Sequence, residues 1–238
     1  MLNDLVGIGM RPAHYEKLTN EQVNIGWLEV HSENHFEINS EATYYLDKAC
    51  ERYPISLHGI GLSLASHELI DTAHVANIKK LITRYQPFNV SEHLSWSDIA
   101  GQHYQQAFTV PYTEENLKHV VKRINLIQQI LEHEIAIENP ASYRQHPHNT
   151  MSEIEFITEV NKQTQCKLLL DINNVHISSC HLNFDAFNYL DKLPSHIINE
   201  IHLSGSLNSG VDNAPNFIET HGHKVNNKVW RLFNHFLQ

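Results

Sequence analysis

The chain has 238 residues, 41% of them hydrophobic, and a formal net charge of −10 at pH 7. This length suits one large domain with a sizeable core, and no linker-like stretch divides it, so we expect a single domain over residues 1–238. Because 17 Lys and Arg stand against 27 Asp and Glu, neither a nucleic-acid binder nor a membrane-surface protein is expected.

Apolar strands alternate with amphipathic helices along the chain. The expected strands cover residues 6–10, 27–33, 54–61, 89–96, 134–140, 168–174 and 200–205. The expected helices cover residues 40–53, 67–87, 113–134, 151–165, 184–193 and 229–236, with a small hairpin over 101–112. Such alternation indicates parallel βαβ units and favours a TIM-type (β/α)8 barrel. The sequence stops before an eighth strand and helix, and no glycine-rich nucleotide loop supports a doubly wound sheet.

The three cysteines show no CxxC or zinc-knuckle spacing, so reduced thiols are expected. The first residues lack a basic segment followed by a long apolar one, and no apolar run approaches the length of a membrane span. These features predict a cytoplasmic protein.

Five successive strands end in a residue that can bind a metal ion. These residues are His58, His93, Glu138, Asp171 and His202. In a barrel the strand ends converge on the active site, so we expect the five side chains to share one small volume and to take part in catalysis. Imidazole and carboxylate ligands without thiolate suit iron, manganese or zinc. A single strand-end histidine is more often structural, but five equivalent positions reverse that expectation.

Three further residues are candidate ligands: Asn174, Glu219 and His221. Eight candidates exceed the needs of one ion, so we expect two or three metal ions bridged by a carboxylate such as Glu138. Asn174 has a second interpretation, because asparagine after a strand often closes a turn. Residues of the segment 29–33 are candidates to orient the ligand imidazoles.

The segments that carry these residues resemble those of one family. They read GIGMRPAHY, WLEVHSENHF, SLHGIGLSL, VSEHLSW, VPYTEENL, IENPASY, LLLDINNV, IHLSG and ETHGHKVNNKVW. In this order, from about residue 6 to residue 233, they are similar to the DUF692 (UPF0276) family of multinuclear non-heme iron-dependent oxidative enzymes. Methanobactin biosynthesis enzymes are known members of that family.

The resemblance implies a xylose-isomerase-like barrel with two or three irons. It further implies that O2 oxidatively modifies a cysteine, or a similar residue, in a ribosomally synthesised precursor peptide, and that a small partner protein presents the leader peptide. The eight residues named above match the family's ligand motifs, except that Glu219 stands where the family usually has aspartate. A homo-oligomer is compatible with the sequence.

Two other functions remain open at this level. One is a divalent-metal isomerase or phosphodiesterase of related barrels, working with zinc or manganese and without O2. The other is a non-catalytic metal-binding or peptide-binding relative. The acidic charge disfavours an endonuclease, which needs a basic groove.

Overall fold

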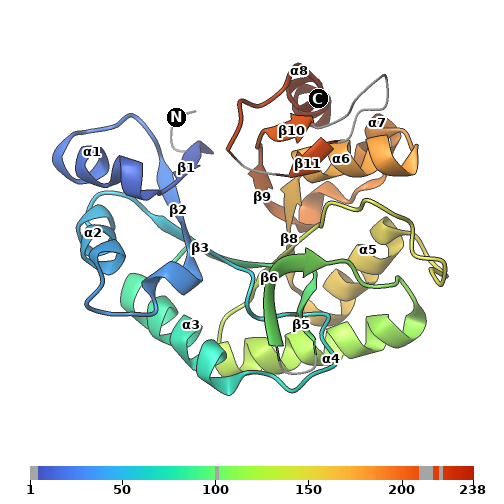
Figure 1. Ribbon diagram of the computed structural model, residues 1–238, viewed down its shortest axis with the longest axis horizontal. Coiled ribbons are helices and arrows are strands. Elements are labelled where there is room, and N and C mark those ends of the chain that lie inside the picture. The colour runs from blue at the N-terminus through green and yellow to red at the C-terminus, as the bar shows by residue number, and fades with distance from the viewer. Residues whose placement is uncertain (1–4, 100–101, 209–216, 220–221) are drawn as a thin grey trace. The chain divides into compact units, whose positions relative to one another are not determined.

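The computed structural model describes residues 5–99, 102–208, 217–219 and 222–238 (Figure 1). The chain divides into two compact units, and each is described by itself. The first unit comprises Met1–Leu62, Leu69–Glu92 and Ile127–Ile135. The second comprises Ser63–Glu68, His93–Leu126 and Ala136–Gln238. The expectation of a single domain therefore stays a prediction.

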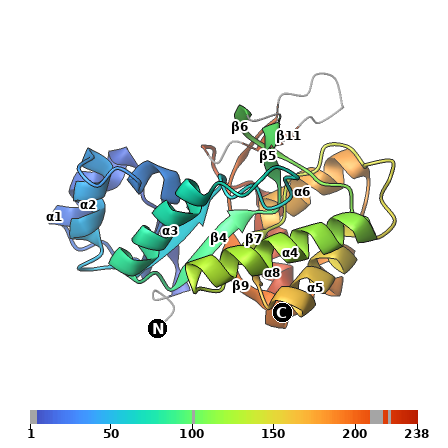
Figure 2. The same ribbon diagram turned by 90° about the horizontal axis from the view of Figure 1, so that it is seen from below.

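The first unit is built on parallel strands in the order β1, β2, β3 and β4. Their bounds are β1 (Gly7–Gly9), β2 (Trp27–His31), β3 (Ile55–Gly59) and β4 (Asn89–His93), the last reaching the first residue of the second unit. The helices are η2 (Pro12–His14), α1 (Tyr15–Asn20), η3 (Ser32–His35), α2 (Glu41–Ala49) and α3 (Thr72–Tyr85), and α1 lies beside α2 (Figure 2). Strand β3 is buried along its whole length, as a parallel strand covered on both faces should be.

The second unit contains three parallel strands in the order β7, β8 and β9. Its strands are β5 (Trp96–Ile99), β6 (Gln102–Phe108), β7 (Ala136–Glu138), β8 (Lys167–Asp171), β9 (Ile198–His202), β10 (Ser206–Asn208) and β11 (Phe217–Glu219). The helices are α4 (Glu114–Leu131, ending in the first unit), α5 (Glu153–Thr164), α6 (Ile172–Leu182), α7 (Ala186–Lys192), η4 (Ser195–Ile197) and α8 (Asn227–Phe236). Strands β5 and β6 form an antiparallel hairpin, and so do β10 and β11. Helix α8 packs against α6 and α7 (Figure 1).

Local sequence explains where these helices begin. The Ser152 hydroxyl accepts the N–H of Glu155, and the Glu155 carboxylate accepts the N–H of Ser152, which completes a capping box on α5. The Thr113 hydroxyl accepts the N–H of Asn116 at the start of α4.

The seven expected parallel strands are all present. The hairpin expected over residues 101–112 is present but begins earlier, because β5 starts at Trp96. Several boundaries differ from those expected, and one of them places an α-helix within an expected strand. We expected the strand at residue 168 to continue to 174, but β8 ends at Asp171 and α6 begins at the next residue. The reason is that the Asp171 carboxylate accepts the N–H of Asn174 and so caps a helix. The β10–β11 hairpin was not expected.

Among the residues that the structure describes, none of the helices combines the length and the apolar character that crossing a bilayer requires.

Candidate metal centre

The three parallel strands of the second unit end in Glu138, Asp171 and His202. Asp171 and His202 lie opposite each other in the β8–β9 register. Each of the three side chains offers one ligand atom, and these atoms lie within 4.8 Å of one another. Both carboxylates have no exposed surface. Because two buried anions in one small volume repel each other, a divalent cation would offset their charge.

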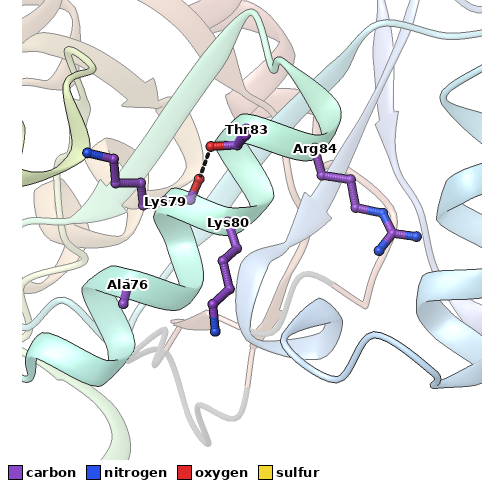
Figure 3. Close-up of a pocket in the computed structure, with 5 residues that line it drawn as sticks. All are labelled: Ala76, Lys79, Lys80, Thr83 and Arg84. Carbon is purple, nitrogen blue, oxygen red and sulfur yellow. Dashed lines mark hydrogen bonds between the residues drawn. The ribbon is translucent and has the colours of Figure 1, made fainter.

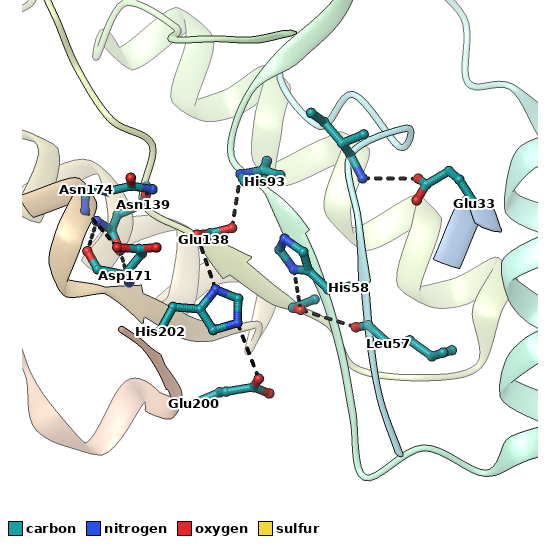
Figure 4. Close-up of polar contacts among 12 residues, drawn as sticks. Glu33, Leu57, His58, His93, Glu138, Asn139, Asp171, Asn174, Glu200 and His202 are labelled. Atoms are coloured by element: carbon teal, nitrogen blue, oxygen red, sulfur yellow. Dashed lines mark hydrogen bonds and ion pairs between the residues drawn. The ribbon is translucent and has the colours of Figure 1, made fainter. Parts of the chain in front are cut away.

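The carboxylate of Glu138 lies between two imidazoles (Figure 4). Its Oε2 atom is 3.0 Å from Nδ1 of His93, and its Oε1 atom is 3.6 Å from Nδ1 of His202. The N–H of Leu94 donates to the main-chain oxygen of Glu138 at 3.0 Å, which holds His93 beside this carboxylate. A carboxylate whose two oxygens face two different histidines is suited to bridge two metal ions.

A pair of asparagines fixes the ends of β7 and β8. Asn139 exchanges two hydrogen bonds with the main chain of Asp171, at 2.8 and 3.1 Å. The Nδ2 group of Asn174 donates to the main-chain oxygen of Asn139 at 3.1 Å. The Oδ1 atom of Asn174 is buried and has no hydrogen-bond partner among the described residues. This orphaned oxygen fits the role of a metal ligand, since a buried polar atom without a partner is costly.

Sequence analysis missed Asn139, although it directly follows Glu138 in the quoted segment IENP. It also missed Glu200, whose Oε1 atom lies 3.6 Å from Nε2 of His202. The available signal was the strand periodicity, because residues two apart on a strand face the same side. Glu200 holds the imidazole with Nδ1 toward Glu138.

His58 belongs to the first unit, where β3 ends. Its Nδ1 atom lies 2.8 Å from the hydroxyl of Ser91, and that hydroxyl donates to the main-chain oxygen of Leu57 at 3.2 Å. Since the hydroxyl proton is used on Leu57, the imidazole donates from Nδ1, and Nε2 keeps its lone pair for a ligand. The ring of His31 meets His58 edge to face. The inclusion of His58 in the same centre as Glu138 stays a prediction.

The structure does not test the last two candidate ligands, Glu219 and His221. Glu219 ends strand β11, but its side chain is not described. His221 lies outside the described residues. Both stay predictions.

Two hollows are lined by other residues than these strand-end candidates. One, of 370 Å³, lies on α3 and is lined by Ala76, Lys79, Lys80, Thr83 and Arg84 (Figure 3). Lys79 pairs with Glu132 and Arg84 with Asp47, so these two cations are already engaged. The other, of 470 Å³, lies in the second unit, and Trp96, Val110, Pro111, His67 and His146 are among its lining residues.

Comparison with solved structures gives the class of fold. The 3-keto-D-glucoside 4-epimerase of E. coli aligns with a TM-score of 0.57 over 98% of this chain and 88% of its own, at 10% identity. Endonuclease IV of Thermus thermophilus aligns with a TM-score of 0.56 over 95% of this chain and 86% of its own, at 14% identity. The fold is therefore an α/β barrel of the xylose-isomerase-like type, as the sequence predicted. At these identities the likeness concerns the fold alone.

Comparison with sequences gives the family. Residues 5–238 match the model described as "RiPP precursor modification enzyme MbnB/TglH/ChrH". A UPF0276 protein of Vibrio parahaemolyticus is 42% identical over 98% of this chain and 81% of its own length, and one of Psychromonas ingrahamii is 40% identical over 98% and 82%. The chain belongs to this family of peptide-modifying enzymes, which confirms the resemblance seen in the sequence.

Proposed function

We propose that the protein is a multinuclear non-heme iron-dependent oxidative enzyme that uses O2 to modify a cysteine, or a similar residue, of a ribosomally synthesised precursor peptide. The observation that carries the proposal is the buried carboxylate of Glu138, whose two oxygens face the imidazoles of His93 and His202. Membership in a family of precursor-peptide modification enzymes supports the substrate class. The chain belongs to an enzyme family whichever metal it binds.

Eight side chains would hold two or three irons: His58, His93, Glu138, Asp171, Asn174, His202, Glu219 and His221. Bound ferrous iron supplies the capacity to bind a thiolate and to activate oxygen. The catalytic set would consist of the five strand-end residues, which are His58, His93, Glu138, Asp171 and His202. Zinc or manganese is the alternative metal for the same donors.

The residues of the chain itself perform the supporting steps. Glu138 would offset the positive charge of the metal ions, and burial keeps bulk water from its carboxylate. The Glu200 carboxylate, whose Oε1 atom lies 3.6 Å from Nε2 of His202, would keep Nδ1 of that ring aimed at Glu138. Asn139 prevents the ends of β7 and β8 from separating.

The peptide needs a place beside the centre. We assign it to the 470 Å³ hollow, because its Trp96 follows His93 by three residues and offers an apolar ring to a peptide side chain. A small partner protein that binds the leader peptide, a homo-oligomer, a cytoplasmic location and a single barrel domain complete the proposal.

Metal analysis of protein purified without oxygen tests the proposal. We expect about two or three irons per chain in the wild type and a loss of most of them in a variant with His93→Ala and Asp171→Ala. Oxygen uptake is then followed with a cysteine-containing precursor peptide, and the same peptide with serine at that position is the control. Zinc or manganese alone, without oxygen uptake, would overturn the oxidative reaction in favour of an isomerase or phosphodiesterase. A chain that takes up little metal would be a non-catalytic relative.

A further inference from the structure

A second group of metal-ligand side chains lies wholly within the first unit. Glu33 comes from η3, His74 from the first turn of α3, and Glu92 from β4. Each offers one ligand atom within 4.8 Å of the others. No residue of the proposed catalytic centre belongs to this group.

Backbone N–H groups hold both carboxylates in place. The Oε1 atom of Glu33 accepts hydrogen bonds from the N–H groups of Ile60 and Gly61, at 3.1 and 2.9 Å. The Oε2 atom of Glu92 accepts the N–H of Leu62 at 3.1 Å. These bonds fix one oxygen of each carboxylate and order three consecutive residues after β3. Burial alone would raise the pKa of Glu33, but the nearby imidazoles of His31 and His74 and the backbone N–H groups hold that pKa well below its ordinary value.

Two buried atoms of the group have no hydrogen bond among the described residues, namely Oε2 of Glu33 and Nε2 of His74. The nearest opposite groups form longer ion pairs. His74 Nε2 lies 3.5 Å from Oε1 of Glu33, and His31 Nδ1 lies 3.5 Å from Oε2 of Glu33. Buried polar atoms without hydrogen bonds usually have an unseen partner such as water or an ion.

Two glycines let the backbone approach this group closely. A Cβ atom built on Gly59 would lie 2.8 Å from Oε2 of Glu92 and 3.2 Å from Oε1 of Glu33. A Cβ atom built on Gly61 would lie 2.1 Å from the ring of His74. Because neither glycine has a side chain, Glu33, His74 and Glu92 can approach one another beside this backbone.

The position of His74 is fixed independently of any ion. The Asp71 carboxylate accepts the N–H groups of Ala73 and His74, which starts helix α3 at this point. The ring of Phe36 meets the imidazole edge to face with centroids 4.9 Å apart. The imidazole is therefore pre-oriented, which lowers the entropy cost of binding a ligand.

We infer that Glu33, His74 and Glu92 form a second, structural site for a divalent first-row transition-metal ion. One imidazole and two carboxylates are a donor set that zinc, manganese and iron accept. His31, whose side chain is half exposed beside Glu33, lies on the solvent side of the group and is the fourth donor. The ion joins η3, α3 and β4 around the loop that follows β3. Its role is to stabilise the first unit rather than to take part in chemistry.

The test uses full-length protein in which the proposed catalytic centre is disabled by Glu138→Gln and His202→Ala. This background is stripped with a chelator and titrated with Co²⁺, followed by its visible absorption, and with Zn²⁺, followed by metal analysis after dialysis. Three variants are compared in it: His74→Gln, Glu33→Gln, and the control His148→Gln at an exposed loop position. Glutamine at position 33 can still accept the N–H groups of Ile60 and Gly61, so the loop is preserved while the anionic ligand is lost.

We expect the background and its control variant to retain about one ion per chain, and His74→Gln and Glu33→Gln to lose it. Zn²⁺ should raise the midpoint of thermal unfolding of the background but not of these two variants. If His74→Gln does not fold, Glu33→Gln decides alone. Equal ion binding in all variants, or no ion binding in the background, would overturn the inference. Glu33, His74 and His31 would then be held together by their ion pairs alone. Because the background lacks the catalytic centre, this result is independent of the proposed reaction.

Discussion

Each of the two units gathers carboxylates and imidazoles into one cluster, and the two clusters differ in their surroundings. In the second unit, the oxygens of Glu138 face the imidazoles of His93 and His202. In the first unit, Glu33 and Glu92 each give an oxygen to backbone N–H groups of the loop after β3. The lesson is that a strand-end glutamate is defined by its neighbours. Where backbone donors are within reach it also orders a loop, and where imidazoles face both of its oxygens it is suited to bridge metal ions.

The largest effect is expected from Glu138→Gln, because it removes the charge shared by two histidines. We expect the metal affinity of the second unit's centre to fall by more than about 100-fold. Loss of a residue that only orients a ligand already lowers metal affinity by about 10-fold to 100-fold, and Glu138 would be a ligand itself. Oxygen uptake with the precursor peptide should disappear. The control is Glu159→Gln, a surface residue paired with Lys162 on α5. Full metal content in Glu138→Gln would show that this carboxylate is structural, like those of the first unit.

The residues that orient the histidines offer a sharper comparison between the units. Ser91→Ala removes the acceptor of the His58 Nδ1 proton, and Glu200→Gln removes the anion beside His202. Each should weaken iron binding by about 10-fold to 100-fold while the fold is retained. Metal titration measures this, with the exposed Ser195→Ala as the control. If only Glu200→Gln has an effect, His58 is not a ligand of the centre.

Crowding at the first unit's cluster should appear as lost stability. Gly61→Ala places a Cβ atom 2.1 Å from the His74 ring, whereas Gly9→Ala meets nothing within 4 Å. We expect Gly61→Ala to lower the free energy of unfolding by about 1–3 kcal/mol, and Gly9→Ala to leave it nearly unchanged. Urea unfolding compares the two variants. Equal stability would mean that the His74 ring moves aside easily, and the cluster would then not be rigid.

The smallest effect concerns a cap that touches neither cluster. Ser152→Ala should destabilise the protein by about 1 kcal/mol through α5, with metal binding unchanged. Hydrogen bonds from the backbone and side chain of Ser152 lower the pKa of Glu155 from its ordinary 4.5. Their stabilising effect is therefore present above pH 4.5 and is lost as the pH falls below it. Unfolding measured on both sides of that pH should show a smaller difference between wild type and variant in acid.

Much of the fold followed from the sequence, because the hydrophobic period distinguishes strands from helices. The position of α6 did not follow. The segment LLLDINN is continuously apolar up to its polar end, and only the three-dimensional capping bond of Asp171 shows where the strand stops. The β10–β11 hairpin was missed because its strands are only three residues long.

The residues of the candidate site were likewise predicted only in part. Residues at strand ends were predictable, because parallel strands bring their carboxyl ends to one edge. Their partners were not. The proximity of Ser91 to His58 depends on the register of β3 and β4, and the contacts of Asn139 depend on where β8 ends. Neither the register nor the strand ends can be read from one sequence with single-residue accuracy.

The cap of α6 also has an electronic consequence. Asp171 is at once the first residue before that helix and one of the acidic groups at the candidate centre. The amino-terminal end of a helix carries about half a positive charge. Such a charge disfavours any further positive charge nearby. It would therefore favour the lower charge state of any metal ion held by Asp171.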